Sequence, residues 1–337
     1  MNSDELFLEG YRYYCDAGCP EDLQKAVTLL GQASAMGHPA AQDILGNMYE
    51  DGDGVNQDYA VAAELYRQSS EQKYPAGMHD YGELLIYGCG VKEDPEEGFR
   101  LICEATELSN DPDFIFTKSV CYLNGLGVGK DENRAVSLLR DAAEKGSVRA
   151  KSNLGALLME TKPEEAFVLL KDASEEQDPG AMCNLGLMYE MGLSVNVDIK
   201  TAEAYYRQAT EMGYAPAYYH LAMLAVDGHI DLKEADPRGL LAEAGENGCG
   251  EAFLALGIIY YDGNGVEPDM EIASNYFRAG SEAGNPDCKY NLAVMILNRQ
   301  VREEYPDEYV DLIADAADMG YEPAVRFIDD CINENGE

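Results

Sequence analysis

The chain has 337 residues, with 63 Asp or Glu and 24 Lys or Arg, so its formal net charge is −39. This acidity argues against direct binding to a nucleic-acid backbone or an anionic membrane surface, because both require clustered cations. The first residues lack the cationic segment of a secretory signal, and no apolar run reaches the roughly 18 residues of a membrane-spanning helix. The nine cysteines have no regular spacing, which favours reduced thiols over a disulfide framework. We therefore expect a cytoplasmic protein that is not inserted in a membrane.

A pattern of one helix, a Gly-rich turn and a second helix recurs along the chain, and its clearest copy runs from His38 to Lys73. One residue closes the second helix of each copy, and a proline often follows at the start of the next helix. Glycine suits the closing place because helices often end in the left-handed conformation, and proline suits the first turn because it lacks an N–H that would be unsatisfied there. The closing positions are 31 to 37 residues apart and are Gly37, Lys73, Ser109, Gly146, Gln177, Gly213, Gly248, Gly284 and Gly320.

The first helix of a copy carries an apolar residue, then a small residue and, three positions later, an aromatic residue. Examples are LGNMY from Leu45, LGLMY from Leu185 and LGIIY from Leu256. The small residue is expected to let a neighbouring helix approach closely. Four copies continue with the turns EDGDGV, IYGCGV, LNGLGV and YDGNGV, and the second helices carry apolar or small residues at i, i+3 and i+4. Together these motifs resemble the Sel1-like repeat, a relative of the tetratricopeptide repeat.

The resemblance implies an all-α fold, an α/α superhelix or solenoid whose first helices line the concave side. It also implies a role in holding other proteins together, without catalysis. We predict a single solenoid of about nine repeats, in which the fifth, seventh and ninth lose the Gly-Val turn. The fifth has METKPEE in its place, which predicts a local change of curvature. The predicted repeats are 1–37, 38–73, 74–109, 110–146, 147–177, 178–213, 214–248, 249–284 and 285–320, and residues 321–337 form a cap.

No residue pattern indicates an enzyme, a cofactor or a metal site. The four histidines lie in different repeats and lack metal-ligand spacing; they are His38, His79, His220 and His229. The turns at Asp51 and Asp262 lack the full ligand set of a calcium loop. No nucleophile accompanies a histidine in a recognisable order, and no phosphate-binding loop follows a strand pattern. We therefore predict a non-catalytic protein without cofactor or metal.

Three positions of each first helix are expected to face the concave groove: three before, one after and four after its small residue. In the second repeat these are Asp43, Asn47 and Glu50, and in the third they are His79, Glu83 and Ile86. The positions thus pass from polar at the N-terminal end to strongly apolar in the C-terminal half. An apolar strip of this kind favours binding of a helix or extended peptide of another protein. The candidate contacts are Phe116, Leu123, Leu187, Tyr219, Met223, Leu254, Ile258, Tyr261, Tyr290, Val294 and Leu297.

Two alternatives stay open. In one, a tight superhelix buries the strip as core, and the accessibility of Tyr219, Met223, Tyr261 and Tyr290 distinguishes the two cases. In the other, the protein is an acidic decoy that binds a basic or nucleic-acid-binding protein surface. The acidic faces have helical spacing, which is typical of solvated faces, and they comprise Glu234, Asp236, Glu243, Glu246, Asp307, Glu308, Asp311, Asp315 and Asp318. The resemblance makes a scaffold or adaptor in bacterial regulation, host contact or immunity the expected role. We favour a monomer, although the sequence leaves the oligomeric state open.

Overall fold

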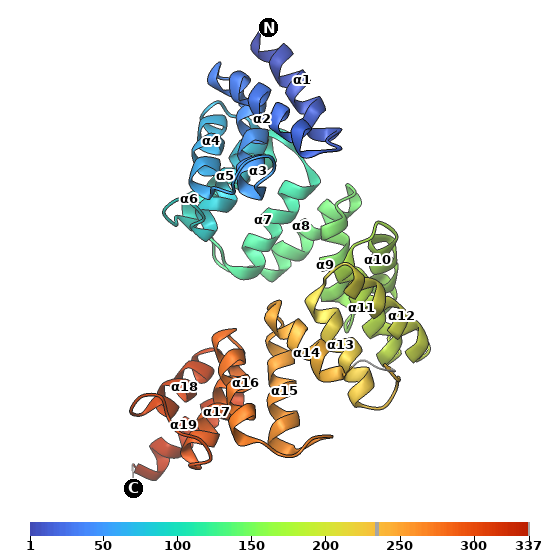
Figure 1. Cartoon of the computed structure of the whole chain (residues 1–337), viewed down its shortest axis with the longest axis vertical. Coiled ribbons are helices and arrows are strands. Elements are labelled where there is room, and N and C mark those ends of the chain that lie inside the picture. The colour runs from blue at the N-terminus through green and yellow to red at the C-terminus, as the bar shows by residue number, and fades with distance from the viewer. Residues whose placement is uncertain (233–235, 336–337) are drawn as a thin grey trace. The chain divides into compact units, whose positions relative to one another are not determined.

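The computed structural model describes residues 1–232 and 236–335, and in these ranges every regular element is a helix (Figure 1). Most of the described helices form hairpins in which an odd-numbered helix packs most closely on the even-numbered helix after it, whereas α9 packs on α8 and α19 packs on α18. Among the helices described, none is long and apolar enough to cross a membrane. The predicted all-α fold of helix-turn-helix repeats is therefore confirmed.

The chain divides into two compact units, Met1–Leu158 and Met159–Glu337. The boundary falls at the shortened turn of the fifth predicted repeat. The first unit contains α1 (Ser3–Cys15), α2 (Pro20–Ala35), α3 (Pro39–Asp51), α4 (Tyr59–Glu71), α5 (Pro75–Tyr87), α6 (Pro95–Ser109), α7 (Pro112–Asn124), α8 (Glu132–Glu144) and α9 (Val148–Leu158). The second contains α10 (Pro163–Glu175), α11 (Pro179–Met191), α12 (Ile199–Glu211), α13 (Ala215–Val226), α14 (Pro237–Glu246), α15 (Gly250–Asp262), α16 (Met270–Glu282), α17 (Pro286–Leu297), α18 (Glu308–Asp318) and α19 (Glu322–Asn335).

The helix ends follow the predicted stop and start signals with one exception. Gly37 has φ 85° and Gly284 has φ 82°, and Lys73 takes the same left-handed conformation with φ 61°. Ser109 was expected to close its helix in this way, but it is still helical, and Asn110 after it has φ 51°. Asparagine tolerates this conformation better than serine, so the helix extends by one residue before it stops.

The small residue of the first helix receives an aromatic ring from the second. A Cβ atom on Gly46 would lie 2.5 Å from Cε1 of Tyr66, and a Cβ on Gly186 would lie 2.5 Å from Cε1 of Tyr206. Both tyrosine side chains are fully buried. The predicted close approach of a neighbouring helix is therefore present in both units, and it sets the spacing within each hairpin.

First helices also lie next to one another within a unit. In the first unit α1 contacts α3, α3 contacts α5 and α7 contacts α9, and in the second unit α15 contacts α17. Side chains from consecutive repeats can therefore form one surface. The candidate site lies on a surface of this kind, formed by adjacent first helices.

Candidate functional site

The apolar residues predicted to line the groove differ in accessibility. Phe116 is only 4% exposed, and the guanidinium carbon of Arg149 lies 4.5 Å from the centre of its ring. Phe116 therefore belongs to the core of the first unit, because its ring is already covered within the chain. Ile258 and Leu297, by contrast, are 40% and 43% exposed. The other eight are half-buried: Leu123, Leu187, Tyr219, Met223, Leu254, Tyr261, Tyr290 and Val294.

Six of these residues form two rows in the second unit, which we call the apolar strip. One row lies on α15 and the other on α17, and these helices contact each other. Each row has positions four and then three residues apart, which places its members on one face of the helix. The Nε2 group of Gln300 donates a hydrogen bond of 3.0 Å to the Tyr261 hydroxyl and so links the segment after α17 to α15. The strip consists of Leu254, Ile258, Tyr261, Tyr290, Val294 and Leu297.

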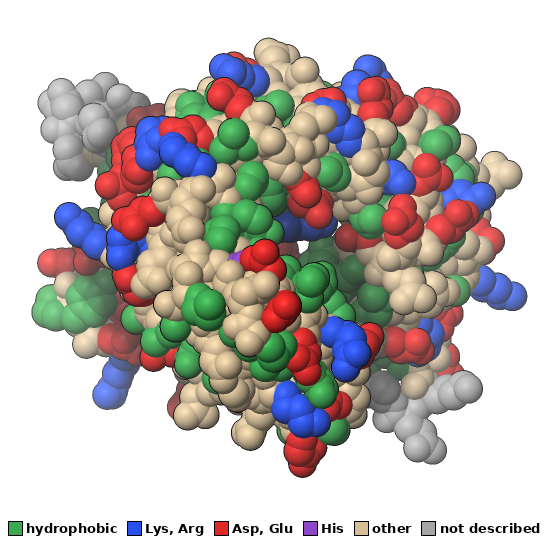
Figure 2. Space-filling model, turned by 90° about the horizontal axis from the view of Figure 1, so that it is seen from above, with side chains coloured by type: hydrophobic (Ala, Val, Ile, Leu, Met, Phe, Trp, Pro, Cys, Tyr) green, Lys and Arg blue, Asp and Glu red, His purple; other side chains and the backbone are tan. Residues whose placement is uncertain are grey.

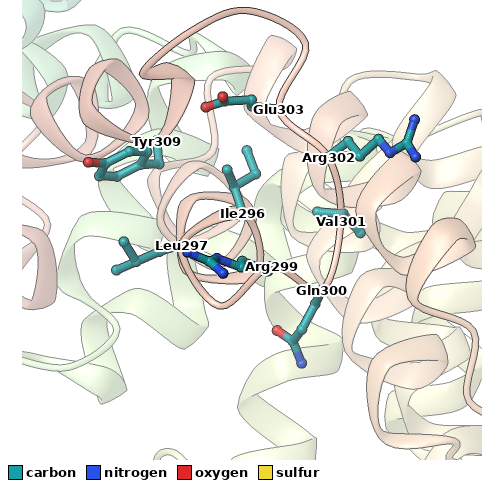
Figure 3. A pocket seen from close by; sticks show the side chains of 8 residues that line it. All are labelled: Ile296, Leu297, Arg299, Gln300, Val301, Arg302, Glu303 and Tyr309. Carbon is teal, nitrogen blue, oxygen red and sulfur yellow. The ribbon is translucent and has the colours of Figure 1, made fainter.

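A cavity of about 700 Å³ adjoins the strip, and its lining includes Leu297. It lies at the turn between α17 and α18, where the ninth predicted repeat has lost the Gly-Val motif. Figure 3 shows the side chains of Ile296, Leu297 and Tyr309 on one side, with the guanidinium of Arg302 pointing away from them. The altered turn is evident in the sequence, but the cavity is not. A loop without a recognisable motif gives no residue signals that determine the path of its backbone.

Tyr219 lines a second cavity of about 420 Å³ at the start of α13 and α15, together with His220 and Cys249. The His220 ring stacks on Tyr206 with their centroids 5.2 Å apart, and it meets the Tyr219 ring edge-on at 5.2 Å. Burial lowers the pKa of His220. This histidine is therefore a packed, neutral side chain.

The polar end of the expected groove is more enclosed than the sequence suggested. Asp43 was expected to face the groove, but it is only 3% exposed, because it lies where α3 packs against its neighbours. Its Oδ1 atom is buried without a hydrogen-bond partner. Burial and the nearby carboxylate of Asp80 raise the pKa of Asp43 to about 8. The Tyr66 hydroxyl lies 2.6 Å from Asn47 Oδ1 and 2.7 Å from Glu50 Oε2, while burial raises the pKa of Glu50.

His79 lies beside this polar cluster on α5. Its Nδ1 atom is 2.7 Å from Asp80 Oδ1, its Nε2 atom is 2.9 Å from Thr117 Oγ1, and its ring stacks on Phe114. Burial lowers the pKa of His79, but the hydrogen bond with Asp80 and the charge of Glu83 outweigh it and raise the pKa overall. The four histidines, considered one by one in the sequence, did not reveal this group. The spacing of His79 and Glu83, one helical turn apart, was the available signal.

The acidic faces follow the sequence expectation only in part. Figure 2 shows acidic side chains interspersed with Lys and Arg. Asp236 pairs with Arg238 at 2.6 Å, and Asp315 pairs with Lys289 at 3.0 Å. Glu234 lies outside the described residues. Glu308 corrects the expectation of a solvated face, because it is 3% exposed and pairs with Arg278. Its Oε2 atom also accepts a hydrogen bond from the backbone N–H of Glu304, so it anchors the altered turn before α18.

The sequence model of the Sel1 repeat family matches residues 8–38, 39–74, 75–110, 119–147, 179–214 and 251–285. The predicted fifth, seventh and ninth repeats, which lack the Gly-Val turn, contain none of these segments.

Solved structures and a curated relative agree with this assignment. A Sel1 repeat protein from Oxalobacter formigenes is 24% identical, with a TM-score of 0.54 over 90% of each chain. A protective antigen of uropathogenic Escherichia coli with an SLR fold is also 24% identical, with a TM-score of 0.55 over 96% of this chain and 70% of the other. An uncharacterised protein of Neisseria meningitidis is 26% identical over 170 residues, which are 46% of this chain and 36% of that protein. Sel1 and related repeats generally mediate protein–protein interactions and are generally non-catalytic. The chain belongs to the Sel1 repeat family.

Proposed function

We propose that the protein is a non-catalytic interaction scaffold or adaptor that binds a helix or extended peptide of a partner protein on the apolar strip of α15 and α17. The partner places apolar side chains over Ile258 and Leu297. A bulky apolar side chain of the partner enters the cavity next to Leu297.

The observation that carries this proposal is the partial exposure of neighbouring apolar side chains on two adjacent first helices. Ile258 and Leu297 are the most accessible members of the strip. Tyr261 and Tyr290 are half-buried and also pack against the core of the second unit. Removing apolar surface from water contributes about 25 cal/mol per Å², so the exposed parts of such a strip favour a complementary apolar face. Half-buried tyrosines add rigid contact area with little further loss of side-chain freedom.

The same positions in the first unit support the choice of the second. Asp43, Asn47 and Glu50 occupy the corresponding places on α3, and His79 and Glu83 occupy two of the three places on α5. On α7 the first of these places holds Phe116, which is buried under Arg149. Polar groups of this kind do not gain from contact with an apolar face, because burial removes them from water. The partner's apolar contacts are therefore assigned to the second unit.

Photo-crosslinking from the strip tests this proposal in the full chain. A photoreactive phenylalanine analogue replaces Ile258, and the same analogue replaces Val310 on α18 in a matched control. Val310 is also exposed, but it lies on a second helix. We expect a partner protein to crosslink from position 258 in the native cell and not from position 310. Equal crosslinking from both positions would contradict the assignment to the strip.

Substitution then measures the contribution of the anchors. Ile258→Asp and Leu297→Asp should each weaken binding of the crosslinked partner by about tenfold or more, equivalent to about 1.4 kcal/mol. Val310→Asp should leave the affinity unchanged. Circular dichroism of each variant confirms that the helices are retained.

A further inference from the structure

Three side chains of α5 bring metal-type donor atoms together in the first unit. His79 Nδ1, a carboxylate oxygen of Asp80 and a carboxylate oxygen of Glu83 all lie within 4.8 Å of one another. The Nδ1 atom is 2.7 Å from Asp80 Oδ1 and 3.7 Å from Glu83 Oε2. Two donors that are each about 2.1 Å from one ion stand about 3.0 Å apart at a right angle and about 3.4 Å apart at a tetrahedral angle. The observed separations bracket these values.

Asp43 supplies a second and independent indication of a missing cation. It comes from α3, not from α5, and its carboxyl group is close enough to that of Asp80 for a hydrogen bond between them. Its Oδ1 atom is buried without a partner. A buried carboxylate oxygen is normally hydrogen-bonded, paired with a charge or bound to a metal. Here the charged group facing Asp43 is another acid, Asp80, so a cation that displaces the proton on Asp43 would pair both carboxylates.

The second unit shows that the fold does not require these polar residues. Residues that lie 140 positions later in the sequence occupy the same place in their repeat. The hydrogen-bonded pair of Tyr66 and Glu50 recurs there as Tyr206 and Glu190. The donor positions, however, are filled by side chains that lack the carboxylates. Asp43, His79, Asp80 and Glu83 correspond to Cys183, Tyr219, His220 and Met223.

We propose that the first unit binds a divalent transition-metal cation through His79, Asp80 and Glu83, with Asp43 as the buried carboxylate that completes its charge balance. Imidazole together with carboxylates suits Zn²⁺ or Mn²⁺. With the ion bound, the Nε2–H group of His79 would donate to Thr117 Oγ1, 2.9 Å away, and the Nδ1 lone pair would bind the ion in place of its hydrogen bond with Asp80.

A small opening gives water and the ion access to this cluster. A cavity of about 210 Å³ is lined by Asp80 and Glu83 of α5 together with Glu50 of α3 and Tyr14 of α1. The cluster supplies few donors, so water in this cavity completes the coordination sphere. The site is therefore a partly open one, reached from the surface of the first unit.

Calorimetric titration of the full chain with MnCl₂ and with ZnCl₂ tests the proposal. Cys15, Cys19 and Cys331 are exposed and are changed to Ser in all proteins, because thiols bind Zn²⁺ on their own. We expect one saturable site in this background. Glu83→Gln should weaken the affinity at least about tenfold, and His79→Asn should do the same. His220→Asn, at the place of Asp80 in the second unit, is the matched control and should have no effect.

A folding defect can be separated from loss of the site. Glu83 is partly exposed, so Glu83→Gln keeps the proposal testable if the buried His79 variant does not fold. Mn²⁺ should also raise the melting temperature of the background protein and not that of Glu83→Gln. Absence of saturable binding for both ions would overturn the proposal, and so would binding that a folded Glu83→Gln protein retains in full.

Discussion

The hydroxyl of Tyr206 lies 2.6 Å from Oε2 of Glu190, and it joins the second helix of a repeat to the end of the first. The ring of Tyr206 is buried, and burial together with Glu190 raises the pKa of its hydroxyl. The hydroxyl therefore stays protonated and donates to the carboxylate. Tyr206→Phe removes this donor and should lower the free energy of unfolding by about 1–2 kcal/mol, because hydrogen bonds to charged groups are worth this much. Urea denaturation measures the change, and a variant as stable as the parent would contradict it.

The glycine of the first helix should not tolerate a side chain. A Cβ on Gly46 would stand 2.5 Å from the Tyr66 ring, so Gly46→Ala forces α3 and α4 apart. We expect a loss of about 1–3 kcal/mol in the free energy of unfolding. Gly31, inside α2, is the control, because a Cβ there meets no atom within 4 Å. Gly31→Ala should stabilise the protein by about 0.5–1 kcal/mol through helix propensity alone.

Asp43 should make the stability of the first unit fall as the pH rises. Its folded pKa of about 8 lies above the value of about 3.9 for an unfolded aspartate, so the folded state holds more protons between these values. The contribution of Asp43 to the free energy of unfolding is therefore largest below about pH 4, and it is lost progressively as the pH rises to about 8. The carboxylate of Asp80 faces it and acts in the same direction as burial, because its charge and its hydrogen bond favour the protonated form of Asp43.

Asp43→Asn removes this titration and should gain about 1–3 kcal/mol over the parent at pH 8. Urea denaturation at several pH values in the presence of a chelator checks the difference between the two profiles. Parallel profiles for parent and variant would show that Asp43 does not hold its proton. The chelator keeps a bound cation from masking the effect.

The salt dependence of partner binding distinguishes the apolar strip from an acidic decoy. Contacts over Ile258 and Leu297 involve no charge, so the affinity should change less than about threefold between 0.05 and 0.5 M NaCl. A decoy that uses the acidic faces should lose affinity steeply over the same range, because salt screens exposed charges. Isothermal titration with the crosslinked partner provides the measurement. A steep decrease would favour the decoy.

The helices and their junctions could be predicted because each repeat carries local signals. The closing glycines, the following prolines and the paired small and aromatic residues act within one hairpin, so a sequence read in order reveals them. The helix end predicted at Ser109 was one residue too early, because whether the helix ends there or at Asn110 depends on the φ angle of a single residue.

The candidate sites were harder to predict because they depend on contacts between repeats. Asp43 and Asp80 are 37 residues apart and meet only because α3 contacts α5. Glu308 had the spacing of a solvated face, but the position of Arg278 on α16 buries it. Phe116 likewise lies under Arg149 from the next repeat. Helical periodicity shows which face a residue occupies, but it does not show what the neighbouring repeat places on that face.

The fit of Tyr66 against Gly46 and of Tyr206 against Gly186 has a consequence for how such a protein can change over time. The ring fixes the distance between the two helices through its contact with the glycine, and this contact is the same in both units. The hairpin therefore keeps its geometry although the side chains of the first unit differ from those at the same places in the second. Those of the first unit are Asp43, His79, Asp80 and Glu83, and those of the second are Cys183, Tyr219, His220 and Met223. Mutations that alter recognition are in this way separated from mutations that endanger folding, and a duplicated repeat can acquire a new ligand without first losing its shape.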